Sequence, residues 1–166
     1  DNDDVASPEN IEESQPDTES MKDDGSTVDV MVVYTPAASK AVGGTNAMNT
    51  LIDLAITETN ASYQNSGVKH RLRLVHKTEV TYTEQGFSTA LNHLTSKTDG
   101  NMDNVHTLRD QYGADEVVLI INDGSSCGVA WLMTTVSTSF ESKGFAVVHH
   151  SCATGYYSFA HEIGHN

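Results

Sequence analysis

The chain has 166 residues, of which 37% are hydrophobic, and a formal net charge of −14 at pH 7. This length leaves room for one domain with a hydrophobic core. The longest apolar stretches, such as VVLII at 117–121, are far too short to cross a bilayer. The chain also lacks a basic stripe that would bind the phosphates of a nucleic acid or an anionic membrane surface. We therefore expect neither nucleic acid nor membrane as a partner.

The negative charge is concentrated at the start of the chain. Residues 1–27 contain ten Asp or Glu and one Lys, which is −9 of the total −14, and they have almost no apolar content. That composition predicts an acidic disordered leader, either a linker or the remnant of a propeptide. A calcium loop is a weaker alternative, because the acidic residues lack the spacing and central glycine of an EF-hand. Nothing at the start resembles a signal peptide, so we expect the sequence to begin after processing.

Folded structure is expected to begin with a strand at 28–34, VDVMVVY, which is β-branched, almost wholly apolar and closed by Pro36. The next segment, from about 46 to 63, has a helical spacing of three and four residues between Met48, Leu51, Ile52, Ala55, Ile56 and Thr59. It is predicted to be an amphipathic helix that ends at NSG, 65–67. Residues 68–82 then alternate in polarity, which predicts a long strand with one wet face.

Two shorter helices are predicted near 87–95 and 102–112, followed by a buried strand at 114–121, ADEVVLII. Strands that alternate with helices indicate an α/β fold with a mainly parallel sheet and right-handed crossovers. Two short apolar stretches come next, CGVAWLM at 127–133 and FAVVHH at 145–150, with a polar loop between them. A helix closes the chain.

The two cysteines lie at the ends of these last two strands. If the strands pair antiparallel, Cys127 lies near Cys152 while Met133 lies near Ala146, and the sulfurs come within bonding range. We expect a disulfide, which implies an oxidising compartment and a secreted protein. Two free buried thiols are the first alternative. The second is a metal site that combines a cysteine with the histidines at 149–150.

The final residues, FAHEIGHN, contain His161, Glu162 and His165 in the spacing H-E-x-x-H. Residues i and i+4 share one face of a helix, so both imidazoles can bind one zinc ion. Glu162, one position further round, can act as general base by taking a proton from zinc-activated water and passing it to the leaving amine. The alternative is a solvated helix end whose histidines favour the helix dipole. The zinc site is favoured by a buried side of the helix, formed by Tyr157, Phe159, Ala160 and Ile163.

The stretch AHEIGHN resembles the active-site helix of metzincin zinc peptidases, above all the adamalysin/reprolysin-like branch and its bacterial relatives, which include the peptidyl-Asp metalloendopeptidases. Gly164 and Asn166 match the usual wording of that branch, HE-apolar-GHN. The resemblance extends over about 28–166. Its other segments are VDVMVVYTPAA (28–38), TETNASYQNSGV (57–68), LRDQYGADEVVLI (108–120) and CGVAWL (127–132).

The resemblance implies a metalloendopeptidase fold with a five-stranded, mainly parallel mixed sheet and one antiparallel edge strand. It also implies that His161 and His165 are zinc ligands and that Glu162 is the general base. The edge strand would bind an extended protein or peptide substrate by backbone pairing. The residues of that strand are Gly128, Val129, Ala130 and Trp131. We expect a monomer that acts on proteins or peptides, and the relatives indicate a preference for acidic residues.

The family's third zinc-binding histidine would lie five residues beyond Asn166. We therefore expect residues 28–166 to be the N-terminal part of a catalytic domain, inactive as it stands. One alternative is a thermolysin-like peptidase with a distant Glu as third ligand, and another is a secreted, non-catalytic α/β interaction module. The histidines at 149–150 are candidates to support the ligands from behind. The remaining ones, His70, His76, His93 and His106, are expected to be surface or half-buried residues.

Overall fold

The computed structural model describes residues 26–166, so the expected acidic leader lies almost entirely outside the described residues. A five-stranded sheet in the order β2-β1-β3-β5-β4 forms the centre of the described part. The strands are β1 (Thr27–Tyr34), β2 (Arg71–Glu79), β3 (Glu116–Ile121), β4 (Gly128–Ala130) and β5 (Phe145–His149). The helices are α1 (Pro36–Val42), α2 (Thr45–Asn65), α3 (Phe87–Thr95), α4 (Asn104–Tyr112), the short 3-10 helix η1 (Thr138–Lys143) and α5 (Ser158–Ile163).

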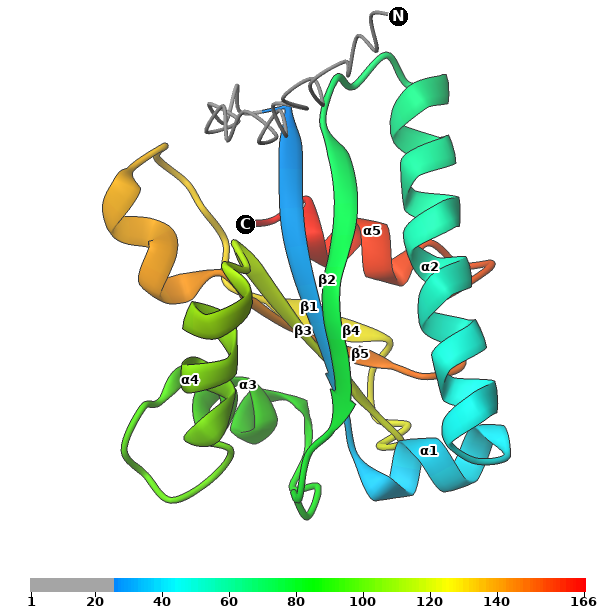
Figure 1. Cartoon of the computed structure of the whole chain (residues 1–166), viewed down its shortest axis with the longest axis vertical. Coiled ribbons are helices and arrows are strands. Elements are labelled where there is room, and N and C mark those ends of the chain that lie inside the picture. Colours follow the sequence, from blue (N-terminus) through cyan, green and yellow to red (C-terminus); the bar gives the residue numbers. More distant parts are fainter. Residues whose placement is uncertain (1–25) are drawn as a thin grey trace, which may run out of the picture.

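The pairing of the strands confirms the predicted fold class. Strand β1 pairs in parallel with β2 on one side and with β3 on the other, and β3 pairs in parallel with β5. Only β4 runs antiparallel, against β5 at the edge of the sheet. The protein is therefore an α/β fold with a mixed, mainly parallel sheet, flanking helices and a helix at the C-terminal end (Figure 1).

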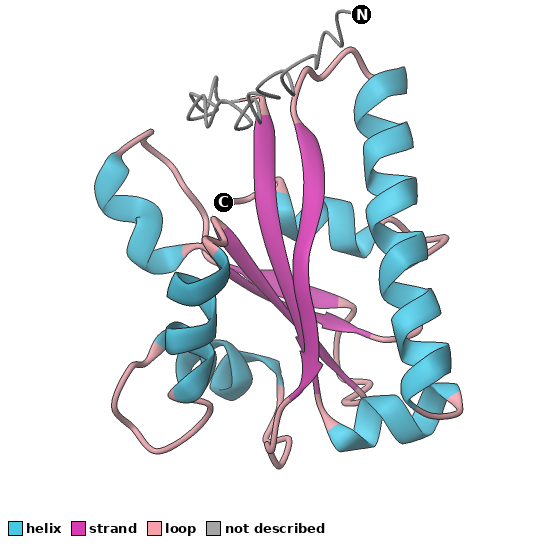
Figure 2. Cartoon of the chain, in the orientation of Figure 1, coloured by secondary structure: helices cyan, strands magenta, loops and turns pink. Residues whose placement is uncertain are grey.

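Helices cover both faces of the sheet (Figures 1 and 2). Helices α1, α2 and α5 pack on one face over Val30 and Val32, and α3 and α4 pack on the other over Met31 and Val33. Successive side chains of a strand point to opposite faces, so β1 sends alternate residues into two separate hydrophobic clusters. This is why its sequence is apolar at almost every position.

Helix α1 was not predicted, although its start carries two ordinary signals. The hydroxyl of Thr35 accepts a hydrogen bond from the backbone N–H of Ala38, and Pro36 occupies the first turn. A hydroxyl cap and a proline at the first helical position both favour helix initiation. Pro36 thus starts a helix as well as ending β1.

Strand β2 is shorter than predicted and contains an irregularity. Its pairing with β1 steps from Leu74 to His76, so Val75 has no partner in the register. Leu74 packs with the cluster on the α2 face, and Val75 packs with the cluster on the α3 face. Leu74 and Val75 lie on opposite faces because side chains alternate along a strand. The bulge places Val75 and His76 on the same side, since His76 pairs with Met31 and stacks on Tyr112 of α4.

The β4–β5 hairpin brings the cysteines together, as predicted, but with a different register at its far end. Cys127 and Cys152 form a disulfide with their Cα atoms 5.5 Å apart. Ala130 pairs with Ala146, so the expectation that Met133 lies near Ala146 is wrong. The chain leaves the sheet after Ala130, and the backbone N–H of Met133 instead donates to the carbonyl of His165.

Within residues 26–166, no helix is long and apolar enough to span a bilayer.

Candidate metal and catalytic site

Helix α5 carries the H-E-x-x-H residues and is fixed to the sheet by its apolar side. Phe159 is fully buried and Ile163 nearly so, both in the cluster that also holds Val148 of β5. The turn before the helix places Tyr157 at a left-handed φ of 58°. With one side of α5 buried in this way, His161 is exposed and His165 is half-buried, while Glu162 is only 6% exposed.

The two histidines converge. Their Nε2 atoms are 3.0 Å apart and their ring planes are nearly perpendicular, at 82°. Two imidazole nitrogens on one tetrahedral zinc ion, with Zn–N distances of about 2.0–2.1 Å, would be roughly 3.3 Å apart. The pair therefore fits a shared ion with little movement. Among the described residues, no cluster of three or more His, Cys, Asp or Glu side chains is suitably placed to hold a metal.

Glu162 lies between α5 and β4, with its side chain over the Cα of Gly128. Burial raises the pKa of its carboxyl group above the ordinary value, and the adjacent His161 and His165 oppose that shift. A carboxyl group with a raised pKa next to two imidazole nitrogens is suited to accept a proton and return it.

Strand β4 exposes one edge beside this carboxylate. The carbonyl of Cys127 accepts a hydrogen bond from the N–H of His149 in β5. Because direction alternates along a strand, the backbone groups of Gly128 and Ala130 point the other way, outward. The hydroxyl of Ser126 donates to the outward carbonyl of Gly128. Within residues 26–166, no strand pairs with this edge.

Trp131 follows the strand but directs its side chain to the opposite face of the sheet. Its indole N–H donates to the hydroxyl of Thr95 on α3 at 2.8 Å, and the ammonium of Lys143 lies 4.2 Å from the ring centroid. The indole is thus an anchor for the end of β4. Of the predicted substrate-binding residues, Gly128 and Ala130 face the α5 side, whereas Val129 and Trp131 pack towards α3.

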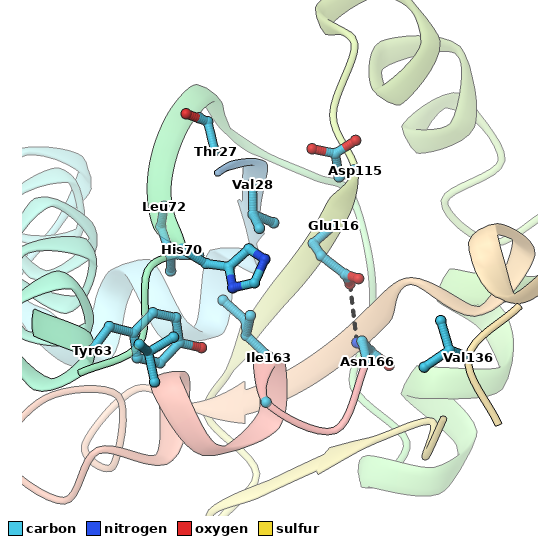
Figure 3. Close-up of a pocket in the computed structure, with 12 residues that line it drawn as sticks. Thr27, Val28, Tyr63, His70, Leu72, Asp115, Glu116, Val136, Ile163 and Asn166 are labelled. Carbon is cyan, nitrogen blue, oxygen red and sulfur yellow. Dashed lines mark hydrogen bonds between the residues drawn. The ribbon is translucent and has the colours of Figure 1, made fainter. Parts of the chain in front are cut away.

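A cavity of about 780 Å³ opens beyond the end of α5 (Figure 3). Val28, Leu72 and Ile163 contribute apolar walls, and Glu116 faces Asn166 across it. The side-chain amide of Asn166 donates to Glu116 at 3.0 Å. Burial raises the pKa of Glu116 to about 7, with Arg109 and Asn166 opposing the rise and Asp115 adding to it. Sequence reasoning missed this pair, because nothing local marks Glu116 as half-buried or as a partner of Asn166.

Five of the six other histidines have partners away from His161 and His165, and the sixth, His70, lines the cavity beyond α5. His150 hydrogen-bonds the side-chain oxygen of Asn122, and His149 bonds Ser151 next to it. His76 stacks on a tyrosine, His93 bonds the hydroxyl of another, and His106 is buried with its ring bonded to a backbone carbonyl. None of these contacts reaches His161 or His165.

Comparisons with known proteins match this arrangement. The family described as "Metallo-peptidase family M12B Reprolysin-like" matches residues 24–166. Proteins named peptidyl-Asp metalloendopeptidase are 47% identical in Stenotrophomonas maltophilia (strain R551-3) and 44% identical in Xanthomonas campestris pv. campestris, each over 141 residues and 84% of this chain. One from Pseudomonas aeruginosa is 35% identical over 150 residues. The chain spans about a third of the first two relatives and a quarter of the third, 32%, 32% and 24% of their lengths.

A solved structure titled "Structure of a chaperone-substrate complex" superposes with a TM-score of 0.66. The two sequences are 21% identical. The superposed part covers 84% of this chain and 25% of the chain in the solved structure. This likeness supports the fold alone.

Proposed function

Because this chain belongs to the reprolysin-like metallopeptidases of family M12B, we propose that it carries the zinc-binding and proton-transfer residues of a metalloendopeptidase. The observation that carries the proposal is the convergence of His161 and His165, 3.0 Å apart at Nε2, beside the buried carboxylate of Glu162. The open edge of β4 adjoins that carboxylate, so a place for the substrate and a base lie together.

The residues divide into three roles. His161 and His165 hold the ion, which when bound polarises the scissile carbonyl and makes water more acidic. Glu162 accepts the proton from the attacking water and delivers it to the leaving nitrogen. The outward N–H and C=O groups of Gly128 and Ala130 hold the peptide in an extended conformation by strand addition, with Val129 and Trp131 keeping β4 in place from the other face.

We further propose that residues 28–166 form the N-terminal part of the catalytic domain and residues 1–27 an acidic leader. Two observations support this division: the described residues offer two converging zinc ligands where such sites use three, and the chain spans 32% of its first relative. On this proposal the 166-residue chain binds zinc weakly and lacks peptidase activity. The family match favours it over a thermolysin-like arrangement with a distant Glu ligand.

Substitution of the site residues tests the proposal in the gene product that contains this chain. His161→Ala and His165→Ala should each lose bound zinc, measured by elemental analysis, and activity on a peptide library. Glu162→Gln should keep its zinc and lose activity by roughly 10²–10⁴-fold. His76→Ala, at a histidine of β2 on the opposite edge of the sheet from β4, is the matched control. Full activity of Glu162→Gln would refute the role of Glu162 as base, whereas a wild-type protein without peptidase activity would favour the non-catalytic interaction module.

The choice of substrate is a separate proposal. The name of the relatives, peptidyl-Asp metalloendopeptidase, supports cleavage beside acidic residues. A peptide library in which Asp is replaced by Asn at each position should lose cleavage where Asp is required, and unchanged cleavage would rule this preference out. The disulfide supports a secreted enzyme, because such bonds persist in oxidising compartments, and thiol titration of the denatured chain would check the bond. We also propose that the enzyme is a monomer, which sedimentation would check.

A further inference from the structure

Gly128 and Glu162 are packed against each other with no room for a side chain between them. A Cβ atom added to Gly128 would lie 2.7 Å from both Cγ and Cδ of Glu162, and closer still to Oε1. Carbon atoms in favourable contact are about 3.5–4.0 Å apart. Any residue other than glycine at this position therefore collides with the carboxyl end of Glu162.

The need for glycine here concerns space and not backbone conformation. The φ angle of Gly128 lies outside the left-handed region that favours glycine, and the residue continues an ordinary strand. Gly124, in the preceding turn, also has an ordinary φ, but a Cβ there would meet nothing within 4 Å. The two glycines thus differ in the one property that matters, which is what lies above the Cα.

The strand side of the contact is fixed, and the carboxyl end of Glu162 has little free space in which to move. Glu162 is 6% exposed on a helix whose neighbouring Phe159 and Ile163 are buried. Gly128 is paired with Val148 in β5 and follows Cys127, which the disulfide ties to Cys152. A methyl group at Gly128 would therefore displace the carboxylate, the more mobile of the two, and would leave the strand largely in place.

We propose that Gly128 is a positioning residue. Because it has no Cβ, the carboxylate of Glu162 can lie directly over its Cα, between the histidine pair and the edge of β4; we call this contact the Gly128 seat. This inference rests on the proposed function of Glu162 as base. The same residue offers its outward carbonyl, now bonded to Ser126, to the edge where a peptide would pair. One residue then sets the distance between the bound peptide backbone and the group that moves the proton.

A stability cycle in this chain tests the contact without any assay of activity. Gly128→Ala should lower the urea midpoint, followed by the fluorescence of the single Trp131, by on the order of 1 M. In the Glu162→Ala background, where Cγ, Cδ and Oε1 are gone, the same substitution should shift the midpoint by less than about a fifth of that. Gly124→Ala is the matched control and should shift neither background.

Each outcome of this cycle either supports or refutes the Gly128–Glu162 contact. If Gly128→Ala fails to fold but the double variant with Glu162→Ala folds, the contact is confirmed. Equal shifts of the urea midpoint in both backgrounds would show that the loss of stability arises from another contact. Failure of both Gly128→Ala and the double variant to fold would show the same, and either result would refute the proposal.

Kinetics of the gene product that contains this chain test the positioning role. Gly128→Ala should lower kcat by about 10²-fold while KM and zinc content stay unchanged, because the substitution misplaces the base and leaves the strand's backbone groups intact. A raised KM with unchanged kcat would indicate damage to the strand and overturn the proposal. The two failures are distinguishable: an active Glu162→Gln refutes the base itself, whereas an inactive Glu162→Gln with a fully active Gly128→Ala refutes only the seat.

Discussion

At the scale of single residues, a hydrogen bond from Asn166, the residue that follows His165, to Glu116 joins the end of the chain to the start of β3 (Figure 3). Their hydrogen bond is made with a carboxyl group whose pKa burial has raised to about 7. The folded protein therefore holds the proton of Glu116 more tightly than the unfolded chain does. Stability that comes from this group is fully present below the unfolded pKa and is lost as pH rises through the folded one.

The predicted consequence is a pH-dependent difference between the protein and Glu116→Gln. Between about pH 4.5 and about pH 7, the free energy of unfolding should fall by on the order of 3 kcal/mol more in the wild type than in the variant. Urea unfolding at several pH values measures it. Glu141→Gln, at an exposed carboxyl group, should behave like the wild type. Parallel pH profiles for wild type and Glu116→Gln would contradict the raised pKa.

The residues of the candidate site differ in how far sequence could reveal them. The H-E-x-x-H spacing acts through a local helix period, so the convergence of His161 and His165 followed from sequence alone. The seat at Gly128 did not, because it depends on how α5 lies over β4 and on the direction of one side chain. Burial of Glu116 was hidden for the same reason, since a charged residue at the start of a strand usually faces water.

At the scale of elements, the two edge strands of the sheet differ in what their outward backbone groups bond. On β2, the outward N–H and C=O of Leu72 are both bonded by the side-chain amide of Asn60 on α2, at 2.7 and 2.9 Å. The amide thus occupies the place of a further strand at that point. On β4, the outward carbonyl of Gly128 has only the hydroxyl of Ser126 among the contacts described above.

Removal of the Asn60 amide should destabilise the fold. Asn60→Ala leaves two backbone groups of Leu72 without their partners in a partly buried position, which should cost roughly 1–3 kcal/mol in the free energy of unfolding. Chemical denaturation measures the loss. Asn65→Ala, at an exposed position of the same helix, should change stability by less than about 0.5 kcal/mol. A similar small effect at Asn60 would mean that water replaces the amide.

Sequence patterns predicted most of the elements and missed α1 and η1. Helix α2 and strands β1 and β3 have strong periodicity or continuous apolar runs, and each lies within a few residues of its prediction. Helix α1 is seven residues long, too short for its period to show, and η1 lies in a loop rich in Ser and Thr. Strand β4 ends at Ala130, and beyond it Trp131 bonds Thr95 and Met133 bonds His165, which are tertiary contacts that the apolar run CGVAWLM does not encode.

At the scale of the whole molecule, one covalent bond ties the edge hairpin to the segment that leads into α5. Cys127 and Cys152 are separated by 25 positions in the sequence, and both neighbour the candidate site. The bond reduces the conformational entropy of the unfolded chain, and in the folded protein it holds the start of β4 near the loop before α5.

Loss of this bond should lower stability by roughly 3.5 kcal/mol in the chain-entropy model. The double variant Cys127→Ala/Cys152→Ala should therefore melt roughly 10 °C lower than the wild type, as followed by circular dichroism. Reductant should lower the melting temperature of the wild type towards that of the variant and leave the variant unchanged. Equal melting temperatures for the two proteins under oxidising conditions would contradict the stabilising role.

The placement of β1 has a consequence for how this protein is made on the ribosome. Its hydrogen-bonding partners on one side are residues 71–79 and on the other 116–120, so both emerge after it. Until residue 121 has left the exit tunnel, an almost wholly apolar segment waits with one or both edges unpaired. Translation itself thus imposes an interval of exposure, which the long separation between partners makes unavoidable. During that interval the nascent chain is exposed to aggregation through the unpaired edges of β1.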